Sequence, residues 1–394
     1  MRIPTDSQVL RKSRVRDLPK YLAWQLTRLG LVLFMTGLAG PAAAQTSHMP
    51  ASHESWLDVV RQTPYWHSQG VADNLKTIRS WVLFSHSYCS EPDRHLLFDH
   101  RGRFLTYLDN GDNSKQTIER LNQTRKQMAE KGRVGQWHPG ADDQLGYPLA
   151  LACHQPFVNI DEVIARLTGE NEDYRVWGTW DGLTIGTQDD QVSLIELFNQ
   201  VYEYRKGQNR FSFPDSVMSS FLGKTIIESG AQKNALSAQA ARGIMQLRPE
   251  VLNDCKIPTE YQLHRMAQVD CALRLVEQNH RNLKAPFEAT FGHLPQNKRQ
   301  QLYGLLLTQA YQIGVGRTIQ LLADEELGKA ARYFAKHAQR FSAEDIQVGM
   351  IYHNLGRDDI GLRSLYYVTD IRLAQQALCT SAARESRARC QDSD

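Results

Sequence analysis

Residues Ile226 to Pro249 read Ile-Ile-Glu-Ser-Gly-Ala-Gln-Lys-Asn-Ala-Leu-Ser-Ala-Gln-Ala-Ala-Arg-Gly-Ile-Met-Gln-Leu-Arg-Pro, and this stretch decides the fold that we expect of the 394-residue chain. It places Glu228 at the end of an apolar run. The next twenty-one residues contain no second acid. A lone acid followed by a loop with glycine and amide side chains suits general acid catalysis in which the substrate supplies the missing nucleophile.

The residues before Glu228 predict a helix, which Pro214 and Asp215 open. Gly230 is a natural stop, so Glu228 falls in the last turn, where unpaired carbonyls present partial negative charge. That charge and an apolar surround both disfavour the carboxylate, so we expect a raised pKa for Glu228, as a general acid needs. The alternative is a solvated glutamate at a helix end. The buried face of this helix is predicted from apolar or small residues at helical spacing: Val217, Phe221, Leu222, Thr225 and Ile226.

The loop after Glu228 has a composition that suits an amide-bearing sugar, such as an N-acetylhexosamine. The run from Gly243 to Gln246 combines a free backbone, the adaptable side chain of Met245 and an amide that both donates and accepts hydrogen bonds. Ser237 adds a hydroxyl. The alternative is an ordinary turn rich in alanine and glycine.

In this order, the residues resemble the catalytic domain of soluble lytic transglycosylases, which shares its core with goose-type lysozymes. The family pattern of Glu-Ser, Ser, Gly-Leu-Met-Gln and a closing Pro is matched without insertions by Glu228-Ser229, Ser237, Gly243-Ile244-Met245-Gln246 and Pro249. Two later stretches look like further family motifs, Ala310-Tyr311-Gln312-Ile313-Gly314-Val315-Gly316-Arg317 and Tyr367-Val368. The resemblance covers roughly residues 213–378, under half of the chain.

The resemblance implies a function and a set of site residues. Glu228 would be the single catalytic acid/base of a peptidoglycan lytic transglycosylase. Ser237, Met245 and Gln246 would line the muramyl-sugar site, and Tyr311 would point its hydroxyl toward the reacting centre. The family's reaction requires no metal and no cofactor.

Three features depart from the family pattern. Gln312 replaces an asparagine, which weakens a structural hydrogen bond more than the chemistry. Arg363 stands where the family usually has a glutamate, which puts contacts to part of the glycan strand in doubt. The interval between Tyr311 and Tyr367 is long, so we expect an inserted helix around 323–348, and Tyr352 in Tyr-His-Asn-Leu-Gly is a second candidate for the tyrosine motif.

The missing second acid favours one mechanism. A retaining glycosidase needs a nucleophilic carboxylate ~5 Å from the acid, and an inverting one needs a base ~6.5–9.5 Å away. Glu250 and Asp254 fall within the next predicted helix. In the reaction that the resemblance implies, Glu228 protonates the glycosidic oxygen between MurNAc and GlcNAc, and the 2-acetamido oxygen stabilises the anomeric cation. Glu228 then takes the proton of the C6 hydroxyl, which closes a 1,6-anhydro ring.

Length and composition predict an ordinary globular protein with about two domains. We expect a mainly α protein, with a lysozyme-like helical domain over 211–378. A smaller domain of unknown role, α+β or mostly helical, would precede it over 45–210. A flexible tail would follow over 379–394. Residues 1–44 carry seven of the 46 basic residues and two of the 43 acidic ones, so the rest has a net charge of −2, which argues against nucleic-acid binding.

Residues 1–44 resemble a secretory signal peptide. A basic segment precedes the apolar run Leu29–Gly40, and Pro41-Ala42-Ala43-Ala44 supplies the small residues of a cleavage site. We therefore expect export to the periplasm and cleavage near Ala44. The alternative is a membrane anchor, but twelve apolar residues fall short of the ~20 that span a bilayer.

An exported chain with six cysteines predicts disulfides. Of the 15 possible pairings, we favour the sequential one, Cys89–Cys153, Cys255–Cys271 and Cys379–Cys390, and the middle pair most. A zinc site at His86, Cys89, His95 and His100 is the alternative. We expect surface histidines there instead.

The region before residue 210 predicts its own elements. Apolar spacing indicates that residues 52–84 are helical, and Leu96–Leu108 reads as a β-hairpin around Arg101-Gly102. Residues 113–130 favour a helix, 132–148 a loop and Gly178–Gly186 a turn with strands. Trp177 and Trp180 beside that turn either stack on sugar rings or pack a small core.

Two other functions remain open from the sequence. The chain could be a non-catalytic glycan-binding or scaffold protein of an envelope complex, because Gln312 and Arg363 depart from the enzyme pattern. It could also be a hydrolytic muramidase. The expected ligand in every case is the glycan strand of peptidoglycan, and a protein partner could dock on the N-terminal region.

Overall fold

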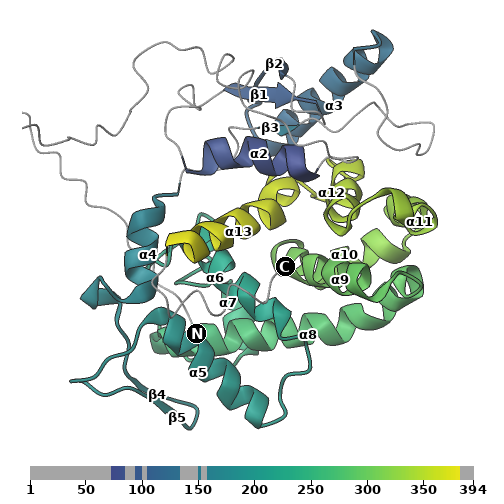
Figure 1. Ribbon diagram of the computed structural model, residues 1–394. Helices are drawn as coiled ribbons and strands as arrows, with labels where there is room; N and C mark the ends of the chain where they lie inside the picture. Colours follow the sequence, from purple (N-terminus) through teal and green to yellow (C-terminus); the bar gives the residue numbers. More distant parts are fainter. Residues whose placement is uncertain (1–71, 85–93, 100–103, 134–149, 152–157, 382–394) are drawn as a thin grey trace, which may run out of the picture. The chain divides into compact units, whose positions relative to one another are not determined.

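The computed structural model describes residues 72–84, 94–99, 104–133, 150–151 and 158–381, and these residues are mainly helical (Figure 1). The expected signal peptide, most of the expected loop at 132–148 and the tail after Ser381 lie outside the described residues. The helices are α2 (Ala72–Leu83), α3 (Ser114–Glu130), α4 (Ile160–Thr168), α5 (Leu194–Gly207), α6 (Ser216–Ser229), α7 (Pro249–Asp254), α8 (Arg265–Phe291), α9 (Gln296–Ile313), α10 (Val315–Ala323), α11 (Lys329–Lys336), α12 (Ala343–His353) and α13 (Leu362–Ser381). Three short 3-10 turns are η2 (Glu172–Tyr174), η3 (Thr259–Tyr261) and η4 (Ala338–Arg340).

Both strand predictions are confirmed. β1 (Arg94–Phe98) pairs antiparallel with β2 (Phe104–Asp109), and β3 (Ala150–Leu151) pairs with the other edge of β1. β4 (Gly178–Trp180) and β5 (Leu183–Ile185) form a second hairpin. Its two turn residues, Asp181 and Gly182, have φ of 45° and 82°, as a tight hairpin turn requires.

The helix that carries Glu228 begins and ends as expected. Asp215 precedes the first turn of α6, and Gly230 terminates the helix in the left-handed conformation, with φ of 60°. The single helix expected around 323–348 is instead two helices, α11 and α12. The helix is interrupted there because Ser342 and Asp345 form a capping box, which begins α12 as a separate helix.

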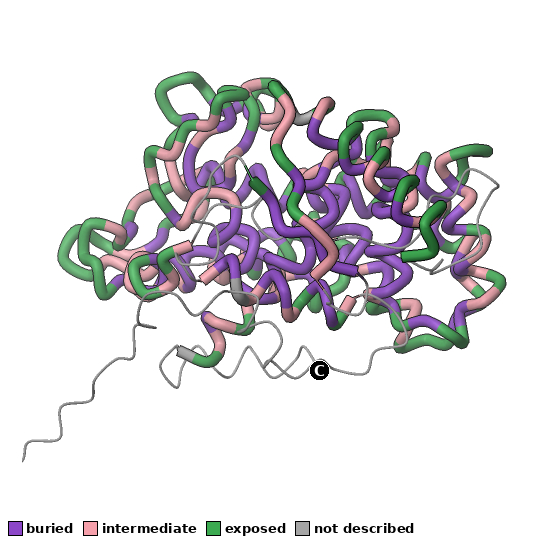
Figure 2. The backbone as a smooth tube through the Cα atoms, turned by 90° about the horizontal axis from the view of Figure 1, so that it is seen from above, coloured by how far each residue is buried: buried purple, intermediate pink, exposed green. Residues whose placement is uncertain are grey.

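The core is built where α6, α9 and α13 pack together. Figure 2 shows buried residues running through the middle of the described chain, with exposed residues at its outer turns. The approach of α6 to α13 is close at Gly223, because a Cβ at that position would lie 2.5 Å from the carbonyl oxygen of Ile371. Only glycine permits this spacing, which sets the distance between the two helices.

Alanine at two helical glycines should therefore change stability in opposite directions. Gly223→Ala should lower the free energy of unfolding by about 1–3 kcal/mol, because the new methyl group meets backbone. Gly304→Ala in α9 meets no atom within 4 Å, and should raise it by about 0.5–1 kcal/mol through helix propensity. Urea denaturation of both variants measures the two shifts. Equal signs would contradict the close approach of α6 to α13.

Buried ion pairs join helices on both sides of residue 210. Arg79 of α2 pairs with Asp370 of α13 at 2.9 Å, and both side chains have no solvent exposure. Arg205 of α5 pairs with Asp270 of α8 at 2.6 Å and is almost as deeply buried. The elements before residue 210 thus contact those after it, and a domain boundary at 210 and 211 remains a prediction.

One predicted disulfide is confirmed. Cys255, which ends α7, is bonded to Cys271 of α8, with Cα atoms 5.7 Å apart. Cys379 is also disulfide-bonded, to a residue outside the described ones. Cys89, Cys153 and Cys390 lie outside the described residues, so their pairing remains a prediction.

The structure corrects one expectation about the histidine cluster. His95 is not a surface residue, because it lies on the buried face of β1 and hydrogen-bonds Asn110. His86, Cys89 and His100 lie outside the described residues. Within the described part of the chain, no three His, Cys, Asp or Glu side chains are grouped as metal ligands.

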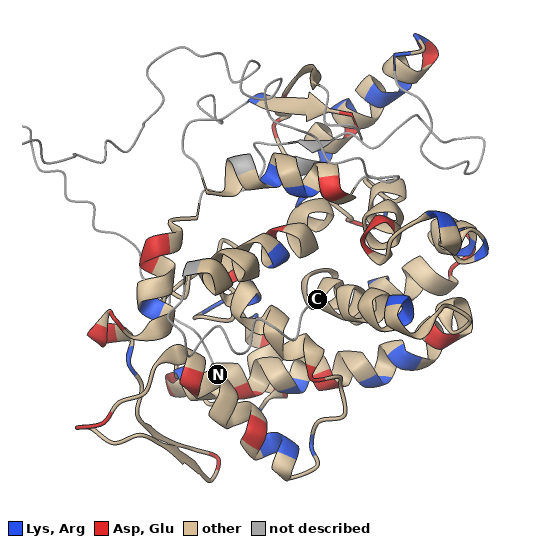
Figure 3. Ribbon diagram, viewed as in Figure 1, with Lys and Arg blue, Asp and Glu red and all other residues tan. Residues whose placement is uncertain are grey.

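Among the described helices, none is long and apolar enough to cross a membrane. Basic and acidic residues are interspersed along the helices in the view of Figure 3.

Candidate functional site

Glu228 receives a hydrogen bond from a tyrosine on another helix. It lies half-buried in the last turn of α6. The hydroxyl of Tyr367, which is buried in α13, donates to Oε1 of Glu228 at 2.6 Å. The close crossing of α6 and α13 at Gly223 makes this bond possible. Two residues from distant parts of the sequence therefore meet at one carboxyl group.

The pKa of Glu228 is raised above its ordinary value of 4.5, as we expected from its position. Burial is the largest cause, because the charged form loses its hydration. The hydrogen bond from Tyr367 and the positive charges of Arg363 and Lys224 lower the pKa, but they do not cancel the effect of burial. Glu228 can therefore hold a proton at a higher pH than an exposed glutamate can.

Tyr311 connects α9 to the loop that follows Glu228. Its hydroxyl donates to the carbonyl oxygen of Met245 at 2.9 Å. On the other side, the hydroxyl of Ser229 donates to the carbonyl oxygen of Ile244 at 2.8 Å. These bonds hold consecutive carbonyls of the loop against α9 and α6. The loop is thus fixed beside Glu228.

The side-chain amide of Gln268, which lies on α8, hydrogen-bonds the backbone of the same loop. Its Oε1 accepts from the backbone N–H of Met245 at 3.0 Å, and its Nε2 donates to the carbonyls of Arg242 at 2.9 Å and Gln262 at 2.6 Å. Gly243 has φ of 70°, and a Cβ there would lie 2.5 Å from the Gln268 amide. The glycine of the sequence motif is therefore required by the backbone conformation and by this buried amide.

Replacing this buried amide should loosen the loop. Gln268→Met keeps the side-chain volume but removes the bonds to the Met245 N–H and the Gln262 carbonyl, whereas the Arg242 carbonyl keeps its bond from the Leu247 N–H, so we expect a loss of about 2 kcal/mol in the free energy of unfolding. Gln320→Met, at an exposed position of α10, should change it by less than about 0.5 kcal/mol. Chemical denaturation compares the two variants. A Gln268→Met protein as stable as the control would contradict the role assigned to this amide.

The structure brings some of the predicted site residues together. Tyr311 and the backbone of Met245 meet beside Glu228, whose charge raises the pKa of Tyr311 further above the value set by burial. The side chain of Met245 is buried, and its sulfur accepts a hydrogen bond from Thr225 at 3.3 Å. It therefore packs in the core beneath the loop.

The other two predicted residues shape the loop. Ser237 Oγ accepts from the N–H groups of Gln239 and Ala241, so it stabilises a turn. Gln246 adopts φ of 47°, and its Nε2 donates to the carbonyls of Ala235 and Gly243. Among the described residues, neither side chain hydrogen-bonds Glu228, and their role in binding sugar remains a prediction.

Sequence reasoning missed two side chains at this site. Tyr367 was recognised only as half of a Tyr-Val pair, and its bond to Glu228 depends on how α6 and α13 cross. Lys224 lies on α6 one turn before Glu228, with no solvent exposure. The available signal was a lysine within the apolar run that leads to the acid.

The structure shows where the residues that depart from the family pattern lie and what they contact. Oε1 of Gln312 accepts from Nε2 of Gln309 at 3.2 Å, and Gln309 in turn accepts from Gln347 of α12 at 2.9 Å, so Gln312 makes a structural hydrogen bond. Arg363 is exposed one turn before Tyr367. Tyr352 is buried, and the Arg125 guanidinium lies 4.2 Å from its ring centroid; its role as the second candidate for the tyrosine motif remains a prediction.

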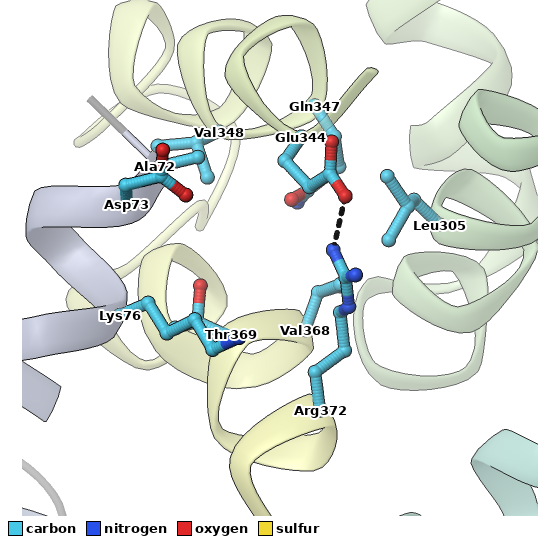
Figure 4. A pocket seen from close by; sticks show the side chains of 10 residues that line it. All are labelled: Ala72, Asp73, Lys76, Leu305, Glu344, Gln347, Val348, Val368, Thr369 and Arg372. Carbon is cyan, nitrogen blue, oxygen red and sulfur yellow. Dashed lines mark hydrogen bonds and ion pairs between the residues drawn. The ribbon is translucent and has the colours of Figure 1, made fainter. Parts of the chain in front are cut away.

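A pocket lined by both polar and apolar side chains lies between α2, α9, α12 and α13 (Figure 4). Its volume is about 70 Å³, enough for roughly two water molecules. Arg372 forms an ion pair with Glu344 across the pocket. Gln347, which lines the pocket, donates a hydrogen bond to Gln309, and Gln309 donates one to Gln312. Burial, with the nearby charges of Asp345 and Glu344, raises the pKa of Asp73 at its edge. The pocket is too small for a sugar ring.

The tryptophans beside the β4–β5 hairpin have different surroundings. Trp177 is 48% exposed. Trp180 is half-buried and packs against Tyr261 and His264, with ring centroids 6.0 Å and 5.6 Å away. Packing thus accounts for Trp180, and Trp177 remains available at the surface.

Comparison with models of protein families, with characterised proteins and with solved structures finds no match to this chain. The chemistry of the site must therefore be argued from its geometry. A protonated carboxyl with a tyrosine hydroxyl on one oxygen can donate a proton and then exist as a stabilised carboxylate.

Proposed function

We propose that the chain is a peptidoglycan lytic transglycosylase, a carbon–oxygen lyase that acts on a polysaccharide. The observation that carries this proposal is the hydrogen bond of 2.6 Å from Tyr367 to the half-buried Glu228. Among the described residues, the charged groups that shift the pKa of Glu228 are two cations, Arg363 and Lys224, and no acid. A site with one carboxyl group supports ring closure by the substrate over a two-carboxylate hydrolysis.

In the proposed reaction, Glu228 donates its proton to the glycosidic oxygen between MurNAc and GlcNAc, and the bond from C1 of MurNAc to that oxygen breaks. The 2-acetamido oxygen stabilises the cation at C1. The C6 hydroxyl oxygen then bonds to C1, and its proton returns to Glu228. The products are a 1,6-anhydro-MurNAc end and a free GlcNAc hydroxyl, and Glu228 is ready for another cycle. Tyr367 stabilises the carboxylate between the two transfers.

The proposal extends to the fold and to the location of the protein. We propose that α6 to α13 form a lysozyme-like domain, since Tyr311 of α9 hydrogen-bonds Met245 in the loop that follows Glu228 of α6. The expected signal peptide would deliver the chain to the periplasm, where peptidoglycan lies. The residues before 210 would then contact the glycan strand or a protein of an envelope complex.

Digestion of purified sacculi by the full chain tests the proposal. Mass spectrometry of the soluble products should find anhydro-muropeptides. Muropeptides with reducing ends would identify a hydrolytic muramidase. Intact sacculi, with the protein bound to them, would identify a glycan-binding or scaffold protein.

A further inference from the structure

Lys224 is a buried cation without a hydrogen-bond partner at the proposed site. Its side chain has no solvent exposure, and its Nζ makes no hydrogen bond within the described residues. A buried ammonium group in this state costs free energy, so a stable protein retains it only where other interactions compensate. Other interactions of the Lys224 ammonium must therefore compensate for the free-energy cost of its burial.

Two aromatic rings flank the Lys224 ammonium. Nζ lies 4.6 Å from the ring centroid of Phe221 on the same helix and 5.0 Å from that of Tyr311 on α9. Ring faces attract a cation, and the attraction is stronger away from water. The rings hold the ammonium at the point where α6 faces α9. They do not neutralise it.

The charged and titratable groups near Lys224 are few. On its own helix, Glu228 follows one turn later, and its charge favours the protonated form of Lys224. Tyr311 faces the ammonium from α9, while Tyr367 and Arg363 act on Glu228 from α13. The loop from Gly243 to Gln246 contributes no charged side chain. Within the described part of the chain, the negative charge that acts on Lys224 is thus that of the proposed catalytic acid.

We propose that Lys224 is a positioning residue whose buried ammonium stabilises the Glu228 carboxylate that forms when the acid gives up its proton. The inference rests on the proposed function. It identifies Lys224 as the buried positive charge that offsets the negative charge of Glu228 at that site. The effect is electrostatic and acts through Glu228, because Lys224 has no exposed atom with which to touch a substrate. A fixed charge aimed at a developing charge, in a place without water, is an efficient form of transition-state stabilisation.

Burial lowers the pKa of Lys224 to about 7, and the Glu228 charge opposes this shift. Each group therefore changes its proton affinity when the other titrates. Lys224 therefore carries its positive charge at pH values below about 7 and loses it as the pH rises through about 7. Removal of the ammonium should accordingly raise the pKa of Glu228.

A titration of the Glu228 carboxyl carbon by NMR tests this inference without any enzyme assay. In the full chain labelled with 13C-glutamate, and with the Glu228 signal identified by its loss in Glu228→Gln, Lys224→Met should raise the Glu228 midpoint by about one unit, a tenfold change in proton affinity. Tyr367→Phe should raise it too, because it removes the hydrogen bond to the carboxylate. Lys329→Met, which removes a half-buried lysine of α11 that pairs with Glu326, should leave it unchanged.

An unchanged midpoint in folded Lys224→Met protein would overturn the inference. The wild-type titration is a second test that needs no lysine variant, because coupling to Lys224 should give the Glu228 curve a second step near pH 7. A single-step wild-type curve would also overturn it. If sacculi stay intact while Lys224→Met shifts the midpoint, the proposed function fails and the electrostatic pair stands. In an active protein, Lys224→Met should lower kcat about tenfold and move the high-pH limb of its profile upward.

Discussion

Glu228→Gln should abolish cleavage of sacculi, with a loss of at least about 10²–10⁴-fold in rate. Glutamine keeps the shape of the side chain, and its carbonyl oxygen can still accept the hydrogen bond from Tyr367. It has no proton to give to the glycosidic oxygen and cannot take one from the C6 hydroxyl. Both transfers of the proposed reaction therefore stop. The rate at which soluble muropeptides are released from sacculi measures the loss.

The matched control for this variant is Glu250→Gln. Glu250 lies in the first turn of α7, a short distance along the chain, and is exposed. We expect its variant to release muropeptides at the wild-type rate. A Glu228→Gln protein as active as Glu250→Gln would exclude Glu228 as the acid.

The same substitution has a predicted effect on stability, which also shows that the variant folds. The pKa of Glu228 is raised in the folded state, so the stability that this group contributes is present at low pH and is lost as the pH rises from about 4.5 through the folded pKa. Glutamine has no such loss. Glu228→Gln should therefore equal or exceed the wild-type free energy of unfolding at pH 7, and its advantage should shrink toward pH 4. Urea titrations at the two pH values measure this.

Asp370→Asn should be the most destabilising substitution among those considered, with a loss of about 3–5 kcal/mol in the free energy of unfolding. Asp370 accepts two hydrogen bonds from Arg79, at 2.9 Å and 3.1 Å, and both side chains have no solvent exposure. Asparagine removes the negative charge that Asp370 places against the buried guanidinium. The pair also fixes α2 against α13, which carries Tyr367. A large fall in the urea midpoint, with an unchanged slope, is the expected result.

A second ion pair on α13 gives the control for Asp370→Asn. Arg372 pairs with Glu344 of α12, but the two side chains are 39% and 23% exposed (Figure 4). Glu344→Gln should therefore cost less than about 1 kcal/mol. Similar losses in the two variants would contradict the dependence on burial that separates these pairs.

The local features of the site could be predicted from the sequence because they depend on short stretches of chain. The apolar run before Glu228 and the glycine after it predicted both the helix and its end, and α6 follows that pattern. The antiparallel pairing of β1 with β2 was predicted by the same kind of local signal. Cys255 and Cys271, separated by 16 residues, were close enough in the chain to be paired correctly.

The partners of Glu228 could not be predicted in the same way. Tyr367 lies 139 residues along the chain, and its bond to Glu228 depends on a helix crossing that Gly223 permits. The Gln268 amide lies 23 residues beyond Met245, and a glutamine on a helix gives no sign that it will be buried. Lys224 was overlooked because a lysine is ordinarily solvated. Sequence patterns predict elements, whereas the contacts between elements come from packing.

Digestion of sacculi in water enriched in 18O tests the central claim most directly, because hydrolysis places a solvent oxygen in the product and ring closure does not. We predict that mass spectrometry will find unlabelled 1,6-anhydro-muropeptides, each one water lighter than the corresponding hydrolysis product. The Glu228→Gln protein should release neither kind. Reducing-end muropeptides that carry 18O would contradict the account, because they would require a water nucleophile in place of the C6 hydroxyl.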